Sequence, residues 1–427
     1  MRSKYFYALS LFVLFMFTAL SVLAQTVNEF SFDGGRFYAA ATLDIDQDGN
    51  TEIIAVGQVN GLDEAEYSAL IVLLSIRENE LHKLSELSFS VNDKGSPLST
   101  RIRSVKIIQD QNQSGWIVYT VGRGGDAEKG VGFLHQAKIE GTKLLDLGYN
   151  IFQMPEAEST HGYPLETGDV DGDGNLEIIY GGFNIIDSHE VADVLVFKIK
   201  DEELSLINRP FEKLLIPLRV NALAASDMDH DGKAEIIIAG RTNKADGMET
   251  SAFAWWSNGN VSFHIFGDGY TSRLRAVMIT DLNNDDHLEL LTGGRIELGK
   301  IWLADVRLWD IKGGEAHLKD QFCWSLGHQI RVRAFTKVQG TMNRFLVGGR
   351  AEQATPQGEM RWLGFTWEFN YDKGHLQPAL SPDFLDYGIE TRVRHLYLSQ
   401  NGETIACGFS KNSENKDSGF VQILKSN

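Results

Sequence analysis

The chain consists of short apolar runs that alternate with turns rich in glycine, asparagine and aspartate. In one segment, beginning at Arg219, the runs RVNALAAS, AEIIIAG, SAFAWWS and VSFHIFG follow one another. Runs of β-branched and aromatic residues between such turns are typical of strands and hairpins rather than helices. The segment therefore predicts four consecutive strands.

This pattern occurs seven times. A glycine ends the second apolar run of each unit, at Gly57, Gly122, Gly182, Gly240, Gly294, Gly349 and Gly408. Four-stranded units repeated in this way predict an all-β fold, a seven-bladed β-propeller. The last unit offers only three strands and the segment VNEFSFD is left over near the N-terminus. We therefore expect the N-terminal strand to join the last blade and close the propeller.

The first residues predict export. Arg2 and Lys4 precede an apolar run that ends with Val22 and Ala24, as in a cleaved secretory signal peptide. We expect a signal peptide at 1–24 and the propeller at 25–427, in a secreted, periplasmic or extracellular protein without a membrane span after cleavage. An uncleaved membrane anchor is the alternative, because the run is just long enough to cross a bilayer.

Four units carry an acidic loop before their second strand: DIDQDGNTE, DVDGDGNLE, DMDHDGKAE and DLNNDDHLE. Carboxylates at positions 1, 3, 5 and 9 and the backbone carbonyl of position 7 are oxygen ligands that suit Ca²⁺, and glycine at position 6 permits a sharp turn. Plain acidic turns are the alternative. The candidate ligands are Asp44, Asp46, Asp48, Asn50 and Glu52; Asp169, Asp171, Asp173, Asn175 and Glu177; Asp227, Asp229, Asp231, Lys233 and Glu235; and Asp281, Asn283, Asp285, His287 and Glu289.

The fourth loop departs from the pattern, because Asn283 stands at position 3 and Asp286 at the glycine position. We expect it to bind calcium more weakly than the other three. In all four loops the bidentate glutamate that an EF-hand needs at position 12 is absent, since that position falls inside an apolar strand. The pattern therefore predicts up to four structural calcium ions in loops between strands.

These loops, each followed by an apolar strand, resemble the FG-GAP or VCBS repeat family. Its calcium-loop propellers occur in the heads of integrin α-subunits and in some secreted polysaccharide lyases. The resemblance covers the whole chain after the signal segment. It implies a calcium-stabilised propeller used mostly for extracellular recognition, but it does not imply which ligand is bound.

The charge of the chain narrows the class of partner. The formal net charge is −18, whereas a nucleic-acid-binding surface needs clustered basic residues. Nucleic acid is therefore not expected as a partner. Cys323 and Cys407 are the only cysteines, and neither lies in a metal-binding or redox motif. We expect both to be unpaired.

Basic residues recur at the head of each predicted innermost strand, eight residues before each acidic loop or its equivalent. Strand direction places them opposite the loops, around one mouth of the central channel. Guanidinium groups bind carboxylate, sulfate or phosphate through paired donors, so the ring predicts a site for an anionic polysaccharide or an extracellular protein. The candidates are Arg36, Arg101, Arg219, Arg273, Arg331 and Arg392, with His161 in the remaining position and a second set at Arg123, Arg241, Arg295 and Arg350.

Ion pairs within each blade are the alternative explanation of the ring. Acids precede each third strand and could bind an arginine of their own blade: Glu66, Glu128, Glu190, Glu249, Glu359 and Asp417. We expect a division, in which Arg273 and Arg331, near the axis, bind the ligand. Arg295 and Arg350, farther out, should form ion pairs.

His161 and Tyr163 are the candidates for catalysis. Neighbouring guanidinium groups disfavour a protonated imidazole, so His161 could act as a base near neutral pH. With an arginine neutralising a uronate, this would give a lyase-like enzyme acting on polysaccharides, the alternative to a non-catalytic recognition module. Motifs of other enzyme classes are absent. The tryptophans, which fall mainly in third strands, are expected to pack between blades.

Overall fold

The computed structural model describes residues 29–424, except 62–64, 78–79, 110–114, 127, 201–202, 213–214, 245–246, 268, 313, 355–357, 380 and 400. These residues form strands and loops without any α-helix, which confirms the predicted all-β class. It follows that this part of the chain contains no helix able to cross a membrane. The predicted signal peptide, residues 1–24, lies outside the described residues.

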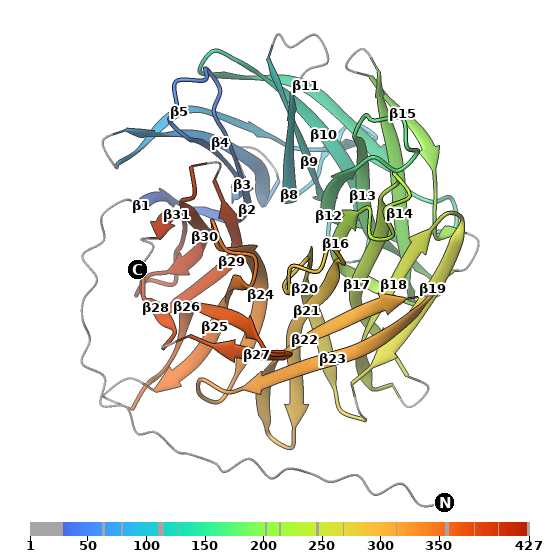
Figure 1. Cartoon of the computed structure of the whole chain (residues 1–427). Coiled ribbons are helices and arrows are strands. Elements are labelled where there is room, and N and C mark those ends of the chain that lie inside the picture. The colour runs from blue at the N-terminus through green and yellow to red at the C-terminus, as the bar shows by residue number, and fades with distance from the viewer. Residues whose placement is uncertain are drawn as a thin grey trace, which may run out of the picture.

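Five sheets have four antiparallel strands each, and they are arranged around a central axis (Figure 1). The first comprises β2 (Gly35–Leu43), β3 (Glu52–Asn60), β4 (Tyr67–Arg77) and β5 (Glu80–Phe89); the second β8 (Thr100–Gln109), β9 (Trp116–Gly124), β10 (Val131–Glu140) and β11 (Lys143–Phe152). The third comprises β12 (Ser159–Gly168), β13 (Glu177–Ile186), β14 (His189–Lys200) and β15 (Glu203–Asn208). The fourth comprises β16 (Arg219–Ser226), β17 (Glu235–Asn243), β18 (Glu249–Ser257) and β19 (Asn260–Phe266); the fifth β20 (Ser272–Thr280), β21 (Glu289–Leu298), β22 (Ile301–Lys312) and β23 (Glu315–Trp324).

A further sheet has nine strands. One part contains β24 (Ile330–Lys337), β25 (Arg344–Ala354) and β26 (Met360–Asp372), with β27 (His375–Pro378) and β28 (Asp383–Leu385) both paired to β26. The other contains β29 (Glu390–Leu398), β30 (Thr404–Lys411), β31 (Asp417–Leu424) and β1 (Glu29–Asp33). A single parallel pair, Trp362 with Glu390, joins the two parts. A small hairpin, β6 (Asn92–Asp93) with β7 (Ser96–Pro97), completes the described strands.

The N-terminal strand β1 pairs with β31, the last described strand. The pairing is antiparallel, with Phe30 opposite Val421 and Phe32 opposite Gly419. The two strands lie side by side in Figure 1. The two ends of the described chain are therefore joined in one sheet.

The core lies between the faces of neighbouring sheets. Ile54 and Val56 of β3 pack in one cluster with Ile102 and Phe133 of the next sheet, and all four are fully buried. Second strands are buried on both faces and therefore read as continuous apolar runs, whereas outermost strands such as β5 are half-exposed. This burial on both sides explains the repeated sequences EIIAV and EIIIAG.

Candidate functional site

Every innermost strand contains a β-bulge at the same place. The antiparallel register with the second strand shifts between Phe37 and Ala39 in β2 and between Leu274 and Ala276 in β20. The equivalent shift occurs in β8, β12, β16, β24 and β29. A bulge places an extra residue in one strand and redirects its side chain.

The repeated glycine is what accommodates each bulge. A Cβ atom on Gly57 would lie 1.8 Å from the carbonyl oxygen of Arg36, and one on Gly294 would lie 2.0 Å from that of Arg273. The other repeated glycines face the equivalent carbonyl at 1.9–2.2 Å. Any larger residue would force the two backbones apart, so the glycine that marks each unit in the sequence is a requirement of the bulge.

The bulged residues form a ring that we call the channel ring: Tyr38, Arg103, Tyr163, Asn221, Arg275, Arg333 and Arg394. All of them line one cavity of about 450 Å³ on the central axis, between the innermost strands. The guanidinium of Arg103 lies over the ring of Tyr38, 4.3 Å from its centroid, and Arg394 lies over the same ring at 5.0 Å. Arg275 Nη1 donates a 2.6 Å hydrogen bond to Asn221 Oδ1.

The channel ring is a cluster of like charges. Burial, followed by the charges of Arg394 and Arg275, lowers the pKa of Arg333 well below its ordinary value. Burial, followed by the charge of Arg103, lowers the pKa of Arg394 to about 10. Because a guanidinium stays protonated near neutral pH, these lowered pKa values indicate how unfavourable the clustered charges are.

The positive charges of the neighbouring arginines change the pKa of Tyr163, another member of the channel ring. Burial raises the pKa of its hydroxyl, but the guanidinium groups of Arg103 and Arg219 outweigh burial and bring the pKa down to about 7. Arg219 Nη2 also donates a 3.4 Å hydrogen bond to the hydroxyl oxygen. A large fraction of Tyr163 is therefore phenolate near neutral pH.

His161 is placed differently from its neighbour. Its side chain is buried and stacks on Phe183 with ring centroids 4.6 Å apart. Arg123 Nη1 donates to Nδ1 at 3.0 Å, and the Ser159 hydroxyl lies 3.0 Å from Nε2. An imidazole that accepts from a guanidinium is neutral, as its neighbours predict. Both ring nitrogens are engaged, however, so the geometry presents Tyr163 rather than His161 to the cavity.

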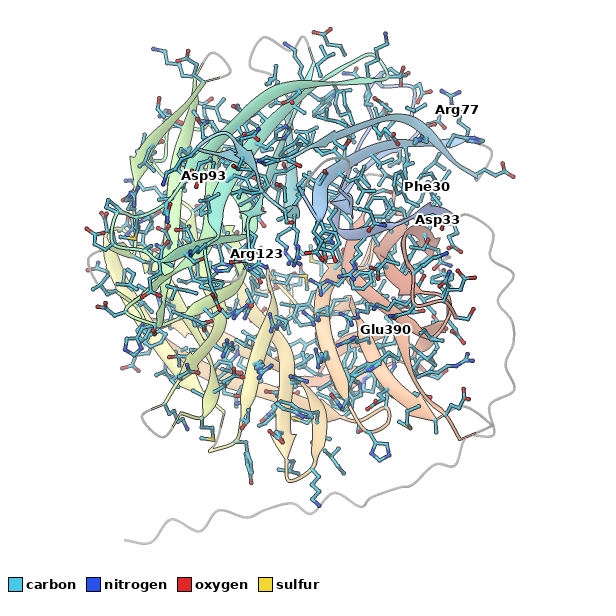
Figure 2. The ribbon with its side chains drawn as sticks, turned by 180° about the vertical axis from the view of Figure 1, so that it is seen from behind. Phe30, Asp33, Arg77, Asp93, Arg123 and Glu390 are labelled. Carbon is cyan, nitrogen blue, oxygen red and sulfur yellow. The ribbon has the colours of Figure 1, made fainter. Side chains whose placement is uncertain are left out.

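The heads of the innermost strands form the predicted mouth ring. Figure 2 shows Arg123 near the centre of the ring of strands and Glu390 to one side of it, over the C-terminal strands. Ion pairs surround this mouth, and three of them connect neighbouring sheets: Arg36 with Asp417, Arg219 with Glu190, and Arg273 with Glu249. Arg350 with Glu390 connects the two parts of the nine-stranded sheet. Arg392 also binds Glu390.

The expectation of ion pairs within one blade is therefore largely wrong. Glu249 in β18 binds Arg241 of its own sheet, but it also binds Arg273 at the head of the next innermost strand. Glu190 likewise binds Arg219 of the next sheet at 2.8 Å. The reason is geometric, because the start of a third strand lies beside the innermost strand of the following sheet. These pairs tie neighbouring sheets together.

The expected division among the arginines also needs correction. Arg331 has no carboxylate partner among the described residues, as predicted. Arg350 is paired, as predicted, but with Glu390 of β29 rather than with an acid before its own third strand. Arg273, predicted to be unpaired, binds Glu249. Arg295, predicted to form an ion pair, instead lies over the ring of Trp302 at 3.8 Å, and its buried Nη1 has no hydrogen-bond partner within the described part of the chain.

Two tryptophans thus support arginines rather than only the core. The guanidinium of Arg295 lies over the ring of Trp302. The ring of Trp362 contacts two guanidiniums, with its centroid 3.9 Å from that of Arg350 and 5.4 Å from that of Arg331. Both rings are half-buried, whereas Trp309 is buried in the core as expected. An aromatic face stabilises a guanidinium without neutralising it, so the charge remains available to an anion.

The acidic loops lie at the other end of the innermost strands and share one backbone conformation. Positions 4 and 6 are left-handed in every loop, for example Gln47 (φ 60°) and Gly49 (φ 86°). The carboxylate at position 1 accepts backbone N–H bonds from positions 5 and 6, as Asp44 does from Asp48 and Gly49. The glutamate at position 9 accepts the N–H of position 2, as Glu52 Oε2 does from Ile45 at 2.9 Å.

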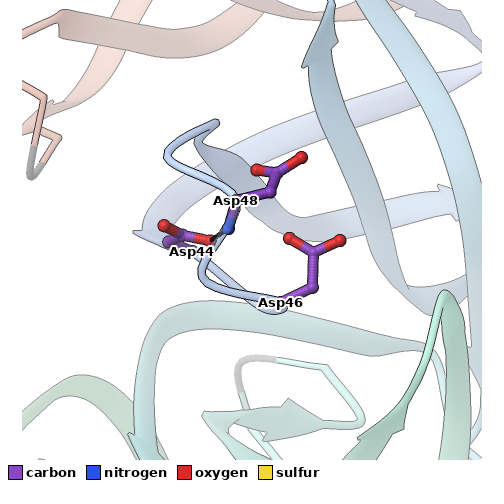
Figure 3. Close-up of side chains that lie close together, drawn as sticks. All are labelled: Asp44, Asp46 and Asp48. Atoms are coloured by element: carbon purple, nitrogen blue, oxygen red, sulfur yellow. Dashed lines mark hydrogen bonds between the residues drawn. The ribbon is translucent and has the colours of Figure 1, made fainter.

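Three of these loops bring carboxylate oxygens within 4.8 Å of one another: Asp44, Asp46 and Asp48 (Figure 3); Asp169, Asp171 and Glu177; and Asp227, Asp229 and Glu235. Burial, together with the neighbouring aspartates, raises the pKa of Glu52, Glu177 and Glu235. In the second loop Glu177 is fully buried and its Oε1 has no hydrogen-bond partner among the described residues. Lys198 Nζ contacts Asp171 and Asp173 at 2.6 and 2.5 Å.

In the fourth loop, protein side chains donate to the carboxylates in place of a cation. The Asn283 side-chain amide donates to Asp285 Oδ2 at 3.0 Å and to Glu289 Oε1 at 2.9 Å, and Lys319 Nζ lies 3.2 Å from Glu289. Asp286 occupies the left-handed position 6 (φ 62°) that glycine takes in the other loops. Protein donors thus satisfy carboxylates that would otherwise face an ion.

Comparisons with known proteins establish the fold. No protein-family model and no curated protein matches the sequence. Among solved structures, the Dos1 propeller superposes with a TM-score of 0.51 at 9% identity, covering 93% of this chain and 94% of that chain. The chain folds as a β-propeller. Sqt1 from Chaetomium thermophilum is similar, with a TM-score of 0.50 at 9% identity over 94% of this chain and 99% of that chain. At such identities the similarity concerns the fold alone.

Sequence reasoning identified the mouth ring of this propeller but missed the channel ring. The signal was present as Arg-x-Arg, in RIRSV, RLRAV, RVRAF and RVRHL. The sequence predicts the first arginine of each pair at the mouth. It does not distinguish the second, because regular strand alternation places both on one face and a bulge is not visible in a hydrophobic pattern.

Proposed function

We propose that the protein is a secreted, calcium-stabilised, seven-bladed propeller of the FG-GAP or VCBS type that recognises an anionic partner at its arginine-rich mouth. In this proposal the nine-stranded sheet represents two blades, β24–β28 and β29–β31 with β1. The single Trp362–Glu390 pair between these parts favours that division. The pairing of β1 with β31 would then close the ring.

Calcium fits three of the four loops. In each, three carboxylates converge and left-handed residues form the turn. The fully buried Glu177 Oε1, which lacks a hydrogen-bond partner among the described residues, is the kind of oxygen that a hard cation would bind. Asp169, Asp171 and Glu177 would hold the ion in the second loop. Its role would be to neutralise like charges and fix the connection between two strands.

Recognition of an anion is supported above all by one observation. Four arginines at the mouth have no carboxylate partner among the described residues, although the chain carries 58 acidic residues. They are Arg101, Arg123, Arg295 and Arg331. Guanidinium groups left unpaired at the opening of a channel suit the carboxylates or sulfates of an acidic polysaccharide. An acidic extracellular protein is the alternative partner.

Binding to heparin and to polygalacturonate tests this function. Arg331→Gln should weaken affinity for both polymers about tenfold, because it removes an available charge at the mouth. Arg344→Gln is the matched control, since Arg344 is a partly exposed arginine that pairs with Glu368. Equal affinity of wild type and Arg331→Gln, or equal losses in both variants, would refute the mouth as the binding site.

A lyase-like activity is the second candidate, and Tyr163 favours it. Its phenolate lies beside Arg103 and Arg219 in a solvent-accessible channel. The phenolate could remove the proton next to a uronate carboxylate while an arginine neutralises that carboxylate. The electrons of the broken C–H bond would form a double bond as the glycosidic oxygen leaves. Ultraviolet absorbance of unsaturated product from uronate polymers, lost in Tyr163→Phe, would support this candidate; no product would exclude it for those polymers.

A further inference from the structure

The cavity inside the propeller has a strongly unbalanced charge. Six cationic side chains line it: Arg103, Lys106, Arg275, Arg333, Lys337 and Arg394. Glu166 is the single carboxylate among its described lining residues, and Lys106 binds it. The four arginines of the channel ring are left without a counterion from the described protein.

The contacts of these four arginines are with aromatic rings and neutral side chains, and none is with a carboxylate of the described residues. Arg103 contacts the rings of Tyr38 and Tyr163, and its buried Nε has no hydrogen-bond partner among the described residues. Arg275 donates to a neutral amide, Asn221. The charges that act on Arg333 are chiefly those of other arginines, Arg394 and Arg275 first among them. Tyr163 can contribute a partial negative charge at most, which does not balance four cations.

The mouth provides an internal comparison. Two residues along a strand span roughly 7 Å, and at that distance from the channel ring Arg273 and Arg392, on two of the same innermost strands, are paired with acids. The acids Asp417, Glu249 and Glu390 form ion pairs with arginines of the mouth, and none of the three lines the cavity. The protein thus supplies acids to several of the mouth arginines, whereas none of the four channel-ring arginines has a carboxylate partner among the described residues. Unpaired charges in a half-buried site are unfavourable unless something binds them.

The geometry points to a binding site for a compact oxyanion that carries at least two negative charges, held by Arg103, Arg275, Arg333 and Arg394. Guanidinium groups converging from several strands suit sulfate, phosphate or paired carboxylates, whose oxygens accept bonds from several directions. A cavity of about 450 Å³ holds a small molecule or the charged end of a polymer but not a folded partner. The site lies deeper than the mouth and does not depend on polymer binding there.

Ethanedisulfonate is a suitable probe, because sulfonates carry fixed charge and bind calcium weakly. Calorimetry should show that it binds the calcium-loaded protein, while methanesulfonate at matched ionic strength should not. Arg333→Met should weaken binding at least tenfold. In chloride buffer the same variant should melt at a higher temperature than the wild type, because one repelling charge is gone. A higher melting temperature would show that the variant is folded, so that its weaker binding reflects loss of the anion site and not unfolding.

Arg344→Met, outside the channel, is the matched control and should change neither binding nor melting by more than a small amount. Competition identifies the natural source of the anion. If galacturonate oligomers displace ethanedisulfonate, the charged end of a polymer enters the channel; if they do not, the ligand is a free small anion. Unchanged ethanedisulfonate affinity in Arg333→Met, or a lower melting temperature with affinity retained, would overturn the site.

Discussion

Arg331 and Arg333 show how position decides the role of a residue. Arg331, at the strand head, rests against Trp362 at 5.4 Å, whereas Arg333, at the bulge, lines the central cavity among other arginines. The sequence motif Arg-x-Arg predicts two cations on one face of a strand. Only the bulge, which depends on the facing Gly349, separates them into the mouth ring and the channel ring.

At Tyr163 the field of the arginines should be directly measurable. Ultraviolet difference titration should reveal one tyrosine ionising near pH 7, and Tyr163→Phe should abolish that step. Because the folded pKa lies below the unfolded value of about 10, the phenolate stabilises the fold. That stabilisation is complete above pH 10 and is lost as the pH falls through 7. A titration in which every tyrosine ionises near pH 10 would contradict the description of the channel.

Arg241 should be a stability residue rather than a binding residue. It bridges Glu190 of the preceding sheet and Glu249 of its own. Arg241→Ala leaves both carboxylates short of a donor and should cost about 2 kcal/mol of unfolding free energy, measured by urea denaturation. Polyanion affinity should change little. Arg331→Ala provides the contrast, since it should cost almost no stability; equal costs in the two variants would refute the distinction between paired and unpaired arginines.

At the scale of the element, the bulge depends on the glycine opposite it. Gly294→Ala would place a methyl group 2.0 Å from the Arg273 carbonyl, so β20 and β21 must separate. We expect a loss of about 3 kcal/mol or more in unfolding free energy, together with weaker anion binding in the channel because Arg275 moves. A loss below about 1 kcal/mol would show that the bulge tolerates a side chain.

The acidic loops differ in how many of their carboxylates accept hydrogen bonds from protein side chains. This difference predicts a ranking of their calcium affinities. Asp171→Ala removes a carboxylate from a convergent trio, whereas Asn283→Ala removes an amide that bridges Asp285 and Glu289. In thermal scans with and without a chelator, Asp171→Ala should lose more of the calcium-dependent stabilisation than Asn283→Ala. The reverse order, or a wild-type protein unaffected by chelation after calcium loading, would contradict the assignment of ligands.

The positions of the strands could be predicted from the sequence. Strands buried between neighbouring sheets appear as apolar runs, and the glycine opposite each bulge recurs once per unit. The segment from Arg219 gave four strands, which are observed as β16 to β19. The left-handed residue at position 6 also follows from the glycine that stands there in three of the four loops. The partners of the mouth arginines could not be predicted, because they lie on a neighbouring sheet and depend on how sheets are placed side by side. Glu249 with Arg273 is the clearest case.

At the scale of the whole molecule, charge is segregated along the axis. Acidic loops lie at one end of the innermost strands, paired and unpaired arginines at the other, and uncompensated arginines in between. A protein with a net charge of −18 therefore presents a positive channel. Such a field attracts small anions while the rest of the surface repels acidic macromolecules that do not fit the opening. This arrangement favours selective binding at the channel over general attraction.

Calorimetric titration of the calcium-loaded protein with a galacturonate oligosaccharide, and with the same oligosaccharide after reduction of its carboxyl groups to alcohols, tests recognition of anions most directly. The two ligands have the same length and nearly the same shape but differ in charge. The account predicts binding of the charged oligosaccharide, weakened by salt, and no measurable binding of the reduced one. Equal binding of both, or binding of the charged oligosaccharide that Arg331→Gln leaves unchanged, would contradict it.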